Sequence, residues 1–175
     1  MRAFPMVIVL AAGAAASAQV VPFTESEPNN SLATADFISQ ALYPTGAVAI
    51  DGAVSAGDVD FFSFNLSAGD FVAFSVFELT PGGSDGYLGI FGPGGVLFAA
   101  DDDNGPGLMP SYAFFVTQSG TWTFGVTGYG DGGFVGDHDE SFQYKAVFAI
   151  NPVVPTPGAL GLLGASGLIA ARRRR

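Results

Sequence analysis

The sequence predicts an all-β protein: an antiparallel, jelly-roll-like β-sandwich of about eight strands, followed by a C-terminal hydrophobic helix. Two observations carry this prediction. Apolar and polar residues alternate with a period of two along several segments, which is the pattern of strands that bury one face. Clusters of Gly, Pro, Ser and Asp separate these segments at short spacing, as expected for the turns of a sandwich.

Eight segments carry the strand pattern. In chain order they are Ala47–Val54, Val59–Leu66, Phe71–Leu79, Tyr87–Phe91, Val96–Ala99, Tyr112–Thr117, Thr121–Thr127 and Phe142–Ile150. The alternation is clearest around Phe62 and Phe64 and around Trp122 and Phe124, so we expect these four aromatic residues to be buried. A short helical turn is expected over 32–37, after Asn30.

The two ends of the chain have the composition of targeting segments. Arg2, an apolar stretch over 7–16 and the small residues Ala16, Ser17 and Ala18 predict a signal peptide at 1–18, which signal peptidase removes before Gln19. At the other end, a Pro-rich linker at 151–157 precedes an uncharged apolar run at 158–171. Fourteen residues span about 21 Å as a helix, less than a bilayer core requires. This segment therefore predicts transient membrane insertion, with the terminal arginines on the cytoplasmic side.

The last 22 residues resemble the PEP-CTERM sorting signal of exopolysaccharide-producing Gram-negative bacteria. The resemblance rests on the apolar run and on the residues Val154, Pro155, Thr156, Pro157, Arg172, Arg173, Arg174 and Arg175. Thr156 stands where the family usually has Glu. The resemblance implies that segment 158–175 is recognised by an exosortase, a membrane-bound transpeptidase that cuts near the Pro-x-Pro sequence.

The region between the two ends is strongly acidic. All 16 acidic residues lie between Glu25 and Glu140, and Lys145 is the only basic residue between Gln19 and Pro157, so this span has a formal charge of −15. Such a charge argues against binding nucleic acid or anionic membrane surfaces and is compatible with cation binding. Because the chain has no cysteine, its stability must come from its core or from bound metal.

Residues 19–150 are expected to form one domain, which resembles the bacterial pre-peptidase C-terminal (PPC) domain. The resemblance is carried by four stretches in the same order and spacing: Glu25–Ser31, Asp58–Phe64 followed by Ala68-Gly69-Asp70, Asp101–Gly105, and Gly120–Phe124. It implies a small β-sandwich of a kind often appended to secreted proteases. In collagen-binding relatives, calcium lies where the acidic N-terminal segment meets the Asp-x-Asp strand.

The residues themselves also suggest a calcium site. Calcium takes six to eight oxygen ligands, which carboxylates and amide carbonyls supply. The candidate ligands are Glu25, Glu27, Asn29, Asn30, Asp58 and Asp60. In the alternative interpretation, segment 27–30 is a turn and helix N-cap, and the two aspartates are solvated charges at a strand edge.

Other polar clusters give weaker indications. Asp101, Asp103 and Gly105 match the start of an EF-hand loop, but Tyr112 stands where that loop requires Glu, which favours a hairpin turn. His138 lies in an Asp-rich segment and is expected on the surface. With one His, no Cys and no G-x-S-x-G sequence, the chain lacks the usual nucleophile motifs, so we expect it not to be an enzyme.

These features together predict an exported, non-catalytic module of the cell envelope, outer surface or extracellular matrix, with a binding or structural role. Its expected partners, besides the processing enzymes, are an exopolysaccharide or an extracellular protein. The alternative is an accessory or catalytic protein of extracellular polymer or protein degradation. Exposed Tyr87, Tyr112, Tyr129 or Phe134 would favour the binding module, and a deep pocket with a buried carboxylate pair would favour an enzyme.

Overall fold

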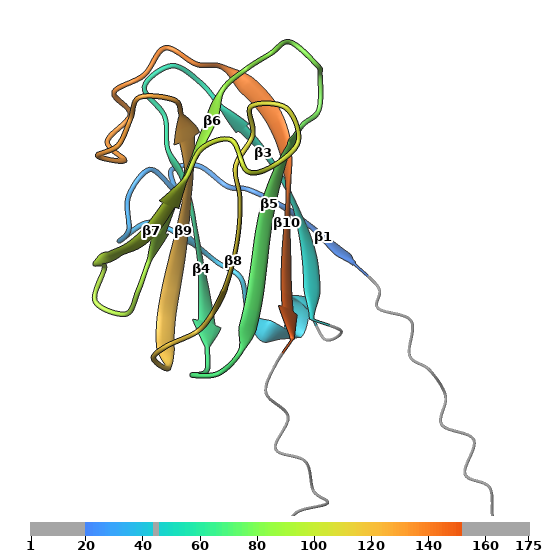
Figure 1. Ribbon diagram of the computed structural model, residues 1–175, viewed down its shortest axis with the longest axis vertical. Coiled ribbons are helices and arrows are strands. Elements are labelled where there is room, and N and C mark those ends of the chain that lie inside the picture. Colours follow the sequence, from blue (N-terminus) through green and yellow to red (C-terminus); the bar gives the residue numbers. More distant parts are fainter. Residues whose placement is uncertain (1–19, 44–45, 152–175) are drawn as a thin grey trace, which may run out of the picture.

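The computed structural model describes residues 20–43 and 46–151, which form a sandwich of two five-stranded sheets (Figure 1). The strands are β1 (Val21–Thr24), β2 (Asp36–Phe37), β3 (Ala47–Val54), β4 (Asp60–Leu66), β5 (Phe71–Glu78), β6 (Gly86–Phe91), β7 (Leu97–Asp101), β8 (Ser111–Phe115), β9 (Gly120–Gly128) and β10 (Phe142–Asn151). The first sheet has the order β1-β3-β10-β5-β8, and the second has the order β2-β4-β9-β6-β7.

The expected all-β sandwich is confirmed, and each of the eight expected strands is present with bounds shifted by two residues at most. The sheets differ from the prediction in being mixed, because β1 pairs with β3, and β2 with β4, in parallel. Both additional strands are too short to show a period of two. The helical turn expected over 32–37 is wrong: a turn closed by the bond from Thr34 N to Ser31 O (3.0 Å) leads directly into β2. A single 3₁₀ turn, η1 (Gln40–Leu42), follows.

Several sequence-based expectations fall on residues outside the described part of the chain. They are the signal peptide at 1–18, the linker after Asn151 and the sorting segment at 158–175 with its hydrophobic helix. Within residues 20–43 and 46–151, no helix is long and apolar enough to cross a membrane.

The core lies between the two sheets and is rich in aromatic side chains. Phe62, Phe64, Trp122 and Phe124 are at most 1% exposed, as their alternation predicts. Phe64 stacks on Phe148 of the opposite sheet, with ring centroids 3.9 Å apart. The two sheets thus pack against each other largely through aromatic rings.

A second, smaller apolar cluster lies on the outer face of the second sheet. Phe134, in the loop between β9 and β10, packs against Phe61 and Phe91 of this face and is 7% exposed. Its backbone is left-handed (φ 53°), and its ring lies so close to Gly89 that a Cβ there would approach it to 2.4 Å. Phe134 is thus not an exposed binding residue, and Tyr129, at 58% exposure, is the member of the predicted aromatic set that faces solvent.

Candidate metal centre

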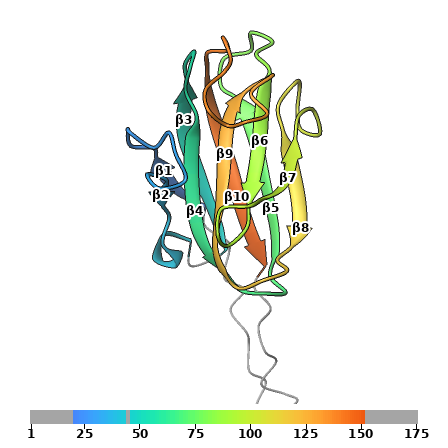
Figure 2. The same ribbon diagram turned by 90° about the vertical axis from the view of Figure 1, so that its left-hand side faces the viewer.

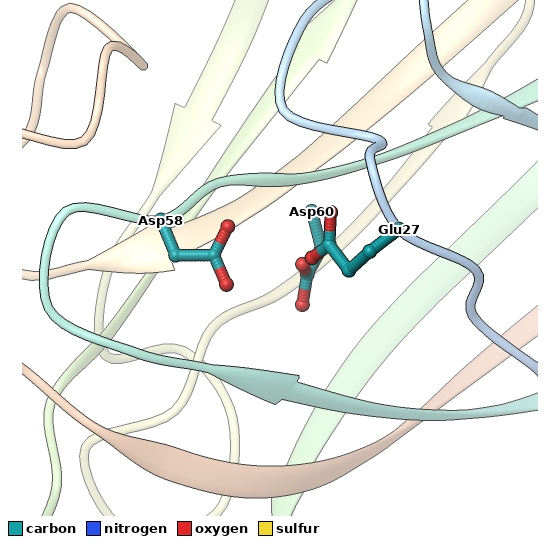
Figure 3. A group of neighbouring side chains, drawn as sticks. All are labelled: Glu27, Asp58 and Asp60. Atoms are coloured by element: carbon teal, nitrogen blue, oxygen red, sulfur yellow. The ribbon is translucent and has the colours of Figure 1, made fainter.

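The acidic N-terminal segment meets the start of β4, and three carboxylates converge there. Glu27, Asp58 and Asp60 each offer an oxygen, and these oxygens lie within 4.8 Å of one another. Figure 3 shows the three carboxylates turned toward one another, Glu27 from the segment before β2 and the two aspartates from the entrance of β4. The sequence could not specify this distance, because 31 positions separate Glu27 from Asp58.

Local hydrogen bonds hold both segments in place. A bond from Glu25 N to Asp51 O (3.1 Å) continues the β1–β3 pairing, and a bond from Phe61 N to Asn29 O (3.2 Å) ties the segment to β4. The turn before β4 is closed by the bond from Asp58 N to Ser55 O (3.0 Å), and the Asp58 carboxylate accepts the backbone N–H of Val59 (2.9 Å). These hydrogen bonds help to hold the three carboxylates close together.

Two of the six predicted calcium ligands are fully buried and have polar atoms without a hydrogen-bond partner in the described part of the chain. Asn29 and Asp60 both have 0% exposure. Neither polar side-chain atom of Asn29, nor Oδ1 of Asp60, has a hydrogen-bond partner among residues 20–43 and 46–151. An unpaired buried polar atom is costly, so the unpartnered oxygens of Asn29 and Asp60 are candidate ligands for a cation.

Asn30 occupies the rim of the cluster. Its side-chain amide donates to Asp58 Oδ1 at 2.7 Å. No helix begins at Asn30 in the described structure, so the N-cap interpretation of this segment is wrong. The alternative that Asp58 and Asp60 are solvated edge charges is wrong as well, because the two residues are 8% and 0% exposed.

Glu25 is a neighbour of Asp60 and interacts with it electrostatically. Burial and the neighbouring Glu25 carboxyl raise the pKa of Asp60 to about 9, although the hydroxyl of Tyr144 opposes this rise by donating to Asp60 Oδ2 at 2.7 Å. Burial also raises the pKa of Glu25 above its ordinary value. In the absence of a cation, Asp60 therefore retains its proton at neutral pH.

Two residues that the sequence did not identify as part of the site hold the backbone of Asp58 in place. The carbonyl of Asp58 accepts the hydroxyl of Thr127 (3.2 Å) and lies 2.8 Å from Nε2 of His138. Nδ1 of this His accepts the N–H of Glu140 (3.1 Å), which leaves Nε2 as the donor to Asp58. His138 is thus a half-buried support and not the surface residue that its loop composition suggests. Its spacing in the sequence contains no indication of this role.

The second acidic region forms a separate and more open cluster. Asp85, Asp102 and Asp103 bring carboxylate oxygens within 4.8 Å of one another. Asp101, the first residue of the EF-hand-like sequence, closes the loop by accepting the N–H of Ser111 (2.8 Å). The hairpin turn expected here is wrong, because β7 and β8 lie in different sheets and the loop crosses from one sheet to the other.

The fold and this carboxylate cluster define an acidic β-sandwich with a candidate centre for a hard cation. No protein-family model and no curated protein sequence matches the chain. Solved structures of similar fold include PliG of Aeromonas hydrophila, a periplasmic lysozyme inhibitor of g-type lysozyme, with a TM-score of 0.51, 13% identity and coverage of 66% of this chain and 96% of that one.

Two further solved structures are similar at lower scores. PliG of Salmonella Typhimurium has a TM-score of 0.45 and 19% identity, over 67% of this chain and 100% of that one. The pre-peptidase C-terminal domain of collagenase from Bacillus anthracis has a TM-score of 0.42 and 18% identity, over 67% of this chain and 94% of that one. At identities this low, what the A. hydrophila structure shares with this chain is its fold.

Proposed function

We propose that this chain is an exported, non-catalytic β-sandwich of the cell envelope or exopolysaccharide matrix, with a binding or structural role, and that calcium locks its N-terminal segment onto β4. The observation that carries the calcium proposal is the meeting of three carboxylates with buried, unpartnered oxygens of Asn29 and Asp60. The PPC-like sequence of the same two segments supports it.

The donor set favours calcium over transition metals. The cluster and its immediate neighbours supply carboxylate and amide oxygens, which are the ligands of hard cations. The chain contains no cysteine, and both ring nitrogens of its single histidine, His138, are engaged by backbone groups. Calcium also tolerates irregular geometry better than magnesium does, which suits ligands drawn from a loop and a strand entrance.

A binding role suits the site better than catalysis does. A general acid must touch its substrate, whereas Asp60, the carboxyl with the raised pKa, has 0% exposure. Tyr129 and Phe115 are instead 58% and 66% exposed, and exposed aromatics are common anchors for sugars and proteins. Co-sedimentation of the protein with the producing organism's exopolysaccharide, with and without calcium, tests the ligand class. The accessory or catalytic alternative gains support if turnover of the polymer, rather than retention, is observed.

Calcium binding is tested by thermal unfolding of the exported protein in calcium, in chelator and in sodium chloride of matched ionic strength. A ligand at about 100 times its Kd stabilises the folded state by about 2.7 kcal/mol. We expect this gain in the wild type and its loss in Asp58→Asn/Asp60→Asn. The charge-matched control is Asp137→Asn/Asp139→Asn, which removes two exposed carboxylates and should leave the gain intact. Equal melting in calcium and sodium contradicts the proposal.

The targeting signals at both ends support export and processing. We propose that signal peptidase removes 1–18 and that an exosortase cuts near Pro155–Pro157, after transient insertion of 158–171. Intact-mass measurement of protein recovered from the envelope should show the loss of both ends. Recovery of chains that retain Arg172–Arg175 as the main species would contradict exosortase processing without affecting the calcium proposal.

A further inference from the structure

The residues that the structure describes leave four sheet edges, formed by β1 and β2 on one side of the sandwich and by β7 and β8 on the other (Figure 2). An edge strand presents unpaired N–H and C=O groups, and proteins commonly protect such edges with prolines, charges, bulges or very short strands. The four edges differ in this respect.

Three edges carry such protection. Strand β1 contains Pro22, and β2 is only two residues long. The pairing of β7 with β6 is interrupted by a register shift next to Phe91, and β7 ends in the acidic residue Asp101. These features hinder a further strand from adding in regular register.

Strand β8 itself contains none of these features, and the carboxylate of Asp101 covers only the N–H of its first residue, Ser111. Its sequence, Ser-Tyr-Ala-Phe-Phe, contains neither charge nor proline, and it pairs with β5 over all five residues without a break. Ala113 is exposed, and Phe115 is 66% exposed. In a domain with 16 acidic residues, this strand is an uncharged, apolar edge.

The hydrogen-bond phase determines which groups this edge offers. Val76 N donates to Pro110 O (3.0 Å), and Val116 N donates to Asp70 O (2.8 Å). Because hydrogen-bonded and non-bonded pairs alternate in antiparallel sheets, the even-numbered residues of β8 point their backbone groups at β5. Ser111, Ala113 and Phe115 therefore point theirs away from the sheet.

From this arrangement we propose that two copies of the chain associate through β8, antiparallel about a two-fold axis at Ala113, so that the first sheets of both copies become one continuous sheet. In this register Ala113 lies opposite its symmetry mate, and Ser111 lies opposite Phe115. All three are outward-bonding residues, so every facing pair is a hydrogen-bonded pair. Since Asp101 already accepts the N–H of Ser111, about four inter-chain backbone bonds remain available.

Charge favours the antiparallel arrangement. Asp101 lies at the Ser111 end of β8, at the start of an acidic loop that also contains Asp102 and Asp103, whereas the Phe115 end has one acidic neighbour, the buried Asp70. Antiparallel pairing sets the acidic loop of each copy beside the Phe115 end of the other, whereas parallel pairing would bring the two acidic loops together and add repulsion. The proposed interface is on the side of the sandwich opposite β1 and β2, so it does not depend on the calcium proposal.

A single cysteine tests this geometry, because the chain has none of its own. Facing residues of a hydrogen-bonded pair have Cα atoms about 5.5 Å apart, within the range that a disulfide spans. Full-length Ala113→Cys should therefore give a disulfide-linked homodimer under mild oxidation, at least about tenfold faster than Ala56→Cys, an exposed control in the turn before β4. Equal rates for the two variants, or linkage of Ala113→Cys to a different protein, would overturn the proposal.

Sedimentation of the full-length protein in detergent provides a second test with the native edge. Ala113→Pro removes an N–H that points away from β5, so it leaves the sheet's own bonds in place and should shift the protein to monomer. Ala113→Lys, which adds a charge at the two-fold axis, should do the same if the proline disturbs folding. Ala149→Lys, on the same face but in the central strand β10, should remain dimeric. A wild type that stays monomeric up to about 100 µM, or an undiminished dimer in both Ala113 variants, would refute the pairing.

Discussion

Raising the pH from 6 to 8 in chelator should destabilise this protein, and Asp60 is the reason. Its folded-state pKa is raised to about 9 by burial and by Glu25, whereas an unfolded Asp has an ordinary pKa near 4. Between these values the folded state holds a proton that the unfolded state has lost. The stabilisation is complete below the unfolded pKa and is lost as the pH rises toward the folded one.

The size of the effect follows from one proton. A difference of one bound proton corresponds to about 1.4 kcal/mol per pH unit, so two units lower the free energy of unfolding by about 2.7 kcal/mol. For a domain of this size, such a loss lowers the Tm by roughly 8–14 °C. This change in the free energy of unfolding per pH unit requires only that the working pH lies between the folded and unfolded pKa values of Asp60. The pKa of Glu25 is also raised by burial, so its titration acts in the same direction.

Thermal melts at pH 6, 7 and 8 in chelator, on wild type and Asp60→Asn, measure this slope. The Asn side chain can still accept the Tyr144 hydroxyl but does not titrate, so the variant should lose most of the pH dependence. At pH 8 in chelator the variant should be more stable than wild type, because it takes up no proton on folding, and saturating calcium should reverse this order. A wild-type Tm that is constant or rises from pH 6 to 8, or an equal slope in the variant, would refute a protonated Asp60.

Three further substitutions test the packing. Phe64→Ala removes a fully buried ring that stacks on Phe148 and should cost roughly 3–5 kcal/mol in urea unfolding; an unchanged midpoint would contradict its place in the core. Tyr144→Phe leaves Asp60 without its hydroxyl donor and should cost about 1–3 kcal/mol in chelator, again by urea unfolding, whereas no loss would mean that this bond is not formed. Gly89→Ala places a methyl group against the ring of Phe134, so near-UV circular dichroism should report a displaced loop and an unaltered spectrum would contradict the contact.

The strand pattern was predictable because it is local. Alternation over 59–66 and 121–127 identifies the strands and the face that points into the core, since every second side chain does so. It does not show that the outer faces of β4 and β9 are largely buried as well. Strands β1 and β2 could not be found in this way, because four and two residues are too few to show a period. Their parallel pairing with β3 and β4 depends on where the chain is held by the rest of the sandwich.

The candidate metal ligands were recognisable by their chemistry and not by their surroundings. Glu27, Asp58 and Asp60 can be read from the sequence as carboxylates on a segment and at a strand entrance that could meet. The burial of Asp60 and its contact with Tyr144, 84 positions further along the chain, depend on the folded structure. The burial of Asp60 and its charged neighbours depend on every segment that packs around it, and they raise its pKa. A short stretch of sequence does not specify these surroundings, whereas its alternation does specify which side chains of a strand point into the core.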